Sequence, residues 1–130
     1  MNKIGAILML VLFAWGGTFS QEMQKKEEKK QKQFIYVLKL VPRLLDEKNW
    51  TEQDGRIVGA HFRRLQQLLK DGKVILAGKT LNDSDPSQFG VVILKVDSEA
   101  EARKIMEEDD AVREKIMTAQ LFAFHVALMQ

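Results

Sequence analysis

The sequence predicts an α+β domain that follows a short export signal. Four apolar segments rich in β-branched and aromatic residues predict strands, and two segments with helical periodicity lie between them. A capping motif precedes each of the two helical segments. The chain has 130 residues, a length that fits a single domain.

The first 20 residues are predicted to be a secretory signal peptide. Lys3 supplies a positive start, and residues 4–17 form an almost unbroken apolar run. This run is shorter than the roughly 20 residues that a transmembrane helix needs. The small residues Thr18 and Ser20 suit a cleavage site before Gln21. We therefore expect a periplasmic or secreted protein, in contact with a membrane only if the signal stays uncleaved.

Residues 21–33 are predicted to be a charged flexible linker, because they include a single apolar residue and no turn residues. The linker carries five lysines and three glutamates, whereas residues 34–130 carry 14 basic and 15 acidic residues. The excess of positive charge thus lies outside the predicted domain. A nucleic-acid-binding domain normally has a basic face of its own, so we expect no nucleic acid partner.

The predicted domain, residues 34–130, begins with a strand over 34–40, which Pro42 ends. A helix follows over 51–70, where Thr51 and Asp54 have the spacing of a capping box. The remaining elements are a strand over 73–80, a loop over 82–88, a strand over 90–96, a helix capped by Ser98 that runs to Asp109-Asp110, and a strand over 119–129.

The order β-α-β-β-α-β is that of ferredoxin-like folds, in which two helices cover one face of a four-stranded antiparallel sheet. The strands are apolar on both sides: Tyr36 and Leu38 point one way, and Ile35 and Val37 the other. Because two helices cover only one face, the other face needs a partner. We therefore expect a homodimer packed sheet against sheet.

Few residues could carry chemistry. The chain has no cysteine, and we expect neither a metal nor a cofactor. His61 lies on the apolar stripe of the first helix, where it is either a proton-transfer group or a core histidine with one backbone partner. His125, in the last strand, has small neighbours that could leave a pocket, or it is structural.

Several acids and one tyrosine have two interpretations each. Asp109-Asp110 ends the second helix, where acids oppose the macrodipole; one of them could orient a histidine, or both could be solvated. Asp85, before a proline, is a turn residue or a ligand-binding residue. Tyr36, in mid-strand, is expected to line any cavity that the sheet encloses.

The chain resembles the YCII-related (YciI-like) family. The resemblance rests on His61 with Leu65 and Leu69, Asp71-Gly72-Lys73, Leu76-Ala77-Gly78, the Asp85-Pro86 loop, residues 98–102 and Asp109-Asp110. It implies a dimeric α+β barrel and a site in which His61 and Asp110 are catalytic, with Tyr36, Gly78, Lys79 and Asp85 around the substrate. Two departures concern this site: the family usually has proline where Lys79 stands, and an Asp-Pro pair where Asp110-Ala111 stands.

Three functions follow from these features. The first is a small lyase or isomerase that moves protons with a His-Asp pair on a ring-like or anionic substrate, as the resemblance implies. The second is a non-catalytic periplasmic dimer that binds a small molecule. The third is a structural role without a ligand. The first requires a carboxylate within hydrogen-bond reach of His61, the second requires a cavity without such a pair, and the third requires neither.

Overall fold

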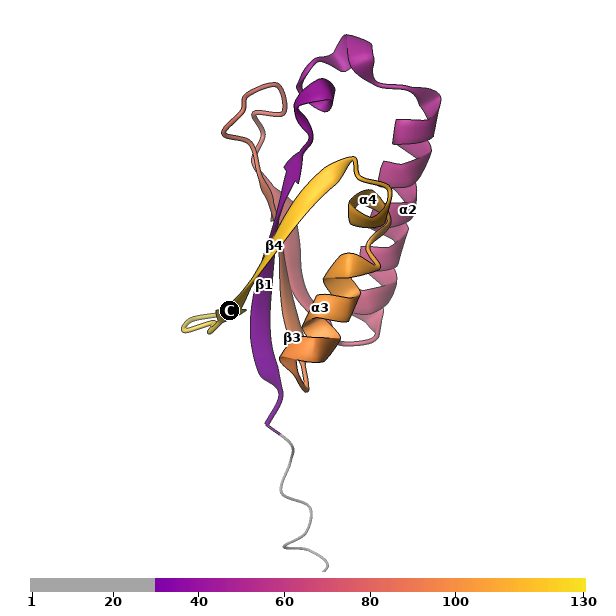
Figure 1. Ribbon diagram of the computed structural model, residues 1–130. Helices are drawn as coiled ribbons and strands as arrows, with labels where there is room; N and C mark the ends of the chain where they lie inside the picture. Colours follow the sequence, from indigo (N-terminus) through magenta and orange to yellow (C-terminus); the bar gives the residue numbers. More distant parts are fainter. Residues whose placement is uncertain (1–29) are drawn as a thin grey trace, which may run out of the picture.

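A computed structural model describes residues 30–130, so the predicted signal and most of the predicted linker lie outside the described residues. Figure 1 shows the arrangement of the elements. In chain order these are β1 (Lys32–Leu40), the 3-10 turns η1 (Pro42–Leu45) and η2 (Glu47–Asn49), α2 (Glu52–Lys70), β2 (Val74–Lys79), β3 (Gly90–Val96), α3 (Glu99–Glu107), α4 (Asp110–Arg113) and β4 (Met117–Phe124).

The four strands form one antiparallel sheet in the order β2-β3-β1-β4. The helices α2, α3 and α4 lie on the same face of this sheet (Figure 1). This is the ferredoxin-like α+β arrangement, and the predicted fold class is confirmed. Within residues 30–130, no helix combines the length and the apolar character that a membrane span requires.

The main core lies between the sheet and the helices. Tyr36, Val92 and Leu94, at the centre of the sheet, have at most 1% of their surface exposed. Val74, Val96, Leu65, Ala102, Ile105 and Met106 pack in the same cluster. Because side chains alternate along a strand, burying Tyr36 turns its neighbours Ile35 and Val37 to the opposite face.

A second, smaller core forms around Leu44, Ala111 and Ile116 at the end of the domain where β1 leaves the sheet. The indole nitrogen of Trp50 donates a hydrogen bond to the carbonyl oxygen of Leu44 at 2.9 Å. This bond fixes the η1–η2 segment between β1 and α2, a segment for which the sequence pattern predicted no structure.

The first turn of α2 is held by an ion pair as well as by its predicted cap. Thr51 accepts from the Asp54 amide, and Asp54 accepts from the Thr51 amide, which completes the capping box. The guanidinium of Arg43 in η1 donates to both carboxylate oxygens of Asp54, at 2.8 and 2.9 Å. At its other end the helix ends at Lys70 and is followed by Asp71, its C-cap, and by Gly72, whose φ of +74° suits glycine.

Three predicted boundaries were wrong. β1 begins at Lys32, inside the predicted linker. The second helix divides into α3 and α4, because Asp109 caps a new helical turn. The last strand ends at Phe124 and does not reach residue 129, because its partner β1 pairs Phe124 with Gln33 at almost its own first residue and offers little backbone beyond.

The middle of the sheet face opposite the helices is apolar. Leu76, Ile93, Ile35 and Phe122 are neighbours across four strands, since Ile93 pairs with Leu76 and with Ile35, and Ile35 pairs with Phe122. Half of the surface of Leu76 and nearly half of that of Phe122 is exposed. We call this row, together with Val37 and Val91, the open face.

Candidate functional site

His61 occupies the third turn of α2 and makes one short hydrogen bond. Its Nδ1 lies 2.7 Å from Oδ1 of Asp109, which is 48 residues away in the sequence. Only 12% of the His61 side chain is exposed to solvent. The bond joins α2 to the junction of α3 and α4, so it depends on how the helices pack over the sheet.

Asp109 is a buried acid, with 1% of its surface exposed. Besides His61, it accepts hydrogen bonds from the hydroxyl of Tyr36 and from the backbone amide of Ala111, both at 3.0 Å. The amide and the hydroxyl are donors, so Asp109 is the acceptor in both of these bonds. It therefore caps α4 and orients the imidazole at the same time.

Tyr36, at the centre of β1, holds Asp109 from the side of the sheet through its hydroxyl group. Its ring is fully buried. Burial, together with the charge of Asp109 and their hydrogen bond, raises the pKa of the Tyr36 hydroxyl far above its ordinary value. The hydroxyl thus keeps its proton and remains a donor to the carboxylate.

The Asp109 bond determines which nitrogen of His61 is available. When the imidazole is neutral, an acceptor at Nδ1 places the ring proton there and leaves the lone pair on Nε2. Nε2 makes no hydrogen bond to any described residue. Every buried side-chain nitrogen or oxygen atom that the structure describes has a partner. Because Nε2 has none, it is not buried and is accessible.

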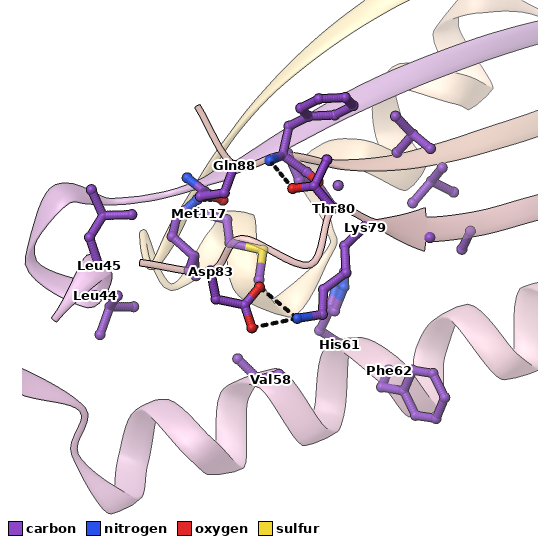
Figure 2. A pocket seen from close by; sticks show the side chains of 18 of the residues that line it. Leu44, Leu45, Val58, His61, Phe62, Lys79, Thr80, Asp83, Gln88 and Met117 are labelled. Carbon is purple, nitrogen blue, oxygen red and sulfur yellow. Dashed lines mark hydrogen bonds and ion pairs between the residues drawn. The ribbon is translucent and has the colours of Figure 1, made fainter. Parts of the chain in front are cut away.

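The accessible side of His61 faces a cavity of about 680 Å³ between α2 and the sheet. Figure 2 shows Val58, His61 and Phe62 along α2 on one side, with Thr80 and Gln88 on the other. Most of the wall is apolar, with side chains that include Leu38, Leu40, Leu44, Trp50, Val92 and Met117. A cavity of this size and character suits a small, largely apolar molecule.

Three polar groups other than His61 stand out in the wall. The ammonium of Lys79 contacts both carboxylate oxygens of Asp83 at 2.7 Å, in the β2–β3 loop (Figure 2). About 60% of each of these side chains is exposed, so the pair lies where the cavity meets solvent. Gln88, by contrast, is a buried polar residue.

The predicted partner of His61, Asp110, is not the one the structure provides. Asp110 is the first residue of α4, and its carboxylate pairs with Arg113 at 2.7 Å. The neighbouring Asp109 contacts His61 instead, because the turn between α3 and α4 directs residue 109 into the core and residue 110 toward Arg113. The two residues are adjacent and of one type, so the sequence offered no basis for separating them.

The other predicted site residues are distributed unevenly. Gly78 and Lys79 line the cavity. Tyr36 does not line it; it lies beneath Asp109 in the core. Asp85 is outside the cavity wall, where its carboxylate accepts from the Ser87 amide in an exposed turn. His125 follows the end of β4 and is exposed.

Sequence reasoning missed Asp109 as the specific partner and Gln88 as part of the wall. For Asp109 there was no separate signal, because Asp109 and Asp110 are adjacent and either of them could cap a short helix. For Gln88 there was none, because its role depends on the fold of the loop. Among residues 30–130, no group of three histidine, aspartate or glutamate side chains is arranged to hold a metal ion.

The comparison with family models identifies the chain. The model of the YCII-related domain matches residues 23–122, well over half of the chain. The protein therefore belongs to the YCII-related family. The search of curated proteins found no match.

Proposed function

We propose that this protein binds a small, largely apolar molecule in the cavity and that His61 moves a proton on it. The observation that carries the proposal is the hydrogen bond between His61 Nδ1 and Asp109, which leaves Nε2 accessible at the cavity wall. A histidine held in this way acts as a general base through the free nitrogen and then returns the proton as a general acid.

The reaction class that fits is a lyase or isomerase reaction without a cofactor. For an unsaturated lactone, Nε2 would remove a proton from the carbon next to the carbonyl group, and the electrons would pass into an enolate. The imidazolium would then return the proton to a different carbon, which moves the double bond and leaves atoms and charge balanced. His61 is the catalytic residue in this scheme, and Asp109 is a positioning residue.

The experiment uses α-angelica lactone, a small unsaturated lactone, in deuterated water. The formation of its β-isomer and the uptake of deuterium are followed by NMR with the wild type, His61→Gln, Asp109→Asn and Asp110→Asn. We expect His61→Gln to lower the rate by about 10²- to 10⁴-fold, the usual contribution of a general base. Asp109→Asn should lower it too, and Asp110→Asn, whose carboxylate pairs with Arg113, should not.

A second candidate, binding without catalysis, is favoured by the apolar wall of the cavity. If the lactone binds in the cavity but neither isomerises nor takes up deuterium, binding without catalysis replaces the first candidate. If His61→Gln is as active as the wild type, the assignment of His61 is wrong.

Two properties of the whole protein belong to the proposal. The chain is exported after cleavage before Gln21, for which the apolar start of the sequence is the support. It forms a homodimer through the open face, for which the exposed apolar row is the support. The mass of the protein purified from its native host would test the first, since a chain that retains residues 1–20 would contradict cleavage.

A further inference from the structure

Gln88 is a buried polar residue in an apolar cavity wall. It lies at the end of the β2–β3 loop, and only 6% of its surface is exposed. Its side-chain oxygen, Oε1, accepts the backbone amide of Leu40, the last residue of β1, at 3.4 Å. That bond defines which end of the carboxamide faces the strand and leaves the nitrogen end for other partners.

The carboxamide nitrogen of Gln88 has two N–H donors, and neither meets an acceptor among the described residues. Because no described buried side-chain nitrogen or oxygen lacks a partner, this nitrogen must retain accessible surface. Gln88 is otherwise enclosed, so the accessible surface is at the cavity that it lines. Figure 2 shows Gln88 across the cavity from Val58 and α2.

The backbone around Gln88 is held firmly. Its amide donates to the carbonyl oxygen of Asp85 at 2.9 Å. The next residue, Phe89, exchanges backbone and hydroxyl hydrogen bonds with Thr80 across the base of the loop. The donor is therefore fixed in place before any ligand arrives, and fixing a donor in advance lowers the entropy cost of binding.

We propose that Gln88 is the specificity-determining residue of the cavity and that it selects ligands with a carbonyl or carboxylate oxygen. This inference rests on the proposed function, because it takes the cavity as the ligand site. An oxygen acceptor would satisfy donors that an apolar ligand leaves unpaired, and leaving buried donors unpaired is costly. The proposed ligand is thus a small, mainly apolar molecule with an oxygen atom on the side opposite α2.

The test compares two neutral molecules of nearly equal shape, acetophenone and ethylbenzene. Only acetophenone has an oxygen acceptor, and since neither is charged, attraction between a charged ligand and Lys79 cannot account for a preference. Binding is measured from chemical shifts of the methyl groups of Leu38 and Val58 and of the side-chain amide of Gln88. We expect acetophenone to bind about five- to tenfold more tightly, the gain of roughly one hydrogen bond, and to shift the Gln88 amide where ethylbenzene does not.

The variant Gln88→Glu replaces the two donors by an acceptor and keeps an oxygen for the Leu40 amide. We expect it to abolish the preference for acetophenone. Gln66→Glu, an equal change of charge on the exposed side of α2, should leave the preference intact. If Gln88→Glu does not fold, the shift of the Gln88 amide in the wild type still decides the question.

The outcomes separate the two proposals. If both molecules shift the cavity methyl groups equally and the Gln88 amide does not respond, the selection by Gln88 is refuted and the cavity remains a binding site. If neither molecule shifts the cavity methyl groups, the cavity is not a small-molecule site, and the proposed function falls together with this inference.

Discussion

At the scale of single residues, the carboxylate of Asp109 connects the core to the site. It accepts from Tyr36 on the sheet and from the Ala111 amide in α4, and it is hydrogen-bonded to His61 on α2. A buried charge is costly unless hydrogen bonds replace its water. These three bonds serve that purpose, and they also align the imidazole, so stability and the proposed chemistry share one group.

The first prediction concerns Tyr36→Phe, which removes a donor to Asp109 and nothing else from the ring. The free energy of unfolding in urea should fall by about 1–3 kcal/mol, the usual penalty for leaving a buried polar group without a partner. A loss below about 0.5 kcal/mol would mean that the hydroxyl bond contributes little. Asp110→Asn, at the neighbouring position that makes no contact with Tyr36, is the control and should change the stability by less than that.

The raised pKa of Tyr36 also predicts how the stability of the protein depends on pH. The pKa of Tyr36 is raised in the folded state above its ordinary value of 10.0. Above about pH 10 the unfolded chain loses this proton while the folded chain keeps it, so stability falls as the pH rises. Wild-type protein should therefore lose stability more steeply between pH 9 and 11 than Tyr36→Phe. Parallel curves for the two proteins would contradict the assignment.

At the scale of elements, the start of α2 depends on one acid. Asp54 is the N3 residue of the capping box and the partner of Arg43, so it ties the η1 turn to the helix. These hydrogen bonds, chiefly that of Arg43, hold the pKa of Asp54 well below its usual range. Since His61 lies two turns further along α2, the position of the candidate site depends on this anchor.

The second prediction follows from the sign of that shift. A depressed pKa gives stability that is present above the ordinary value of 3.8 and is lost as the pH falls below it. Asp54→Asn should therefore lower the melting temperature at pH 7 and should flatten its dependence on pH between 4 and 2. The control is Glu52→Gln, which removes an exposed ion pair with Arg56 and should have almost no effect. Equal acid sensitivity in wild type and Asp54→Asn would refute this role.

At the scale of the whole molecule, the open face is an apolar surface that the helices of the domain do not cover. One face of the sheet is covered by the helices, and the other carries a row of apolar side chains that includes Leu76 and Phe122. Exposed apolar rows of this kind are typical of protein interfaces. A second copy would bring an identical row to cover it.

The third prediction is therefore a dimer that a charge on the open face disrupts. Wild-type protein at micromolar concentration should sediment as a dimer, and Phe122→Lys should sediment as a monomer, because the lysine would be buried without a partner. Leu81→Lys, on the β2–β3 loop and away from the open face, is the control and should remain dimeric. A monomeric wild type would refute the homodimer.

The sequence was sufficient for the order of the strands and helices. Periodicity and capping motifs are local signals, so the helix over 51–70, its Thr51 cap and the strands around Tyr36 and Leu94 could be assigned without the fold. The position at which β4 ends depends on its partner strand β1, which is far away in the sequence. Residues 125–129 are mostly apolar and suit a strand, yet β1 has almost no backbone left to pair with them.

The sequence by itself determined the fold class and the family and marked His61 as a candidate site residue, because each of these depends on residue type and spacing along the chain. Only the tertiary structure decided that Asp109 rather than Asp110 meets His61, that Tyr36 donates to that carboxylate, and that Gln88 accepts from the Leu40 amide. The physical reason is distance along the chain: these contacts join residues 48 or more positions apart, and no local pattern records which side chain the packing turns inward.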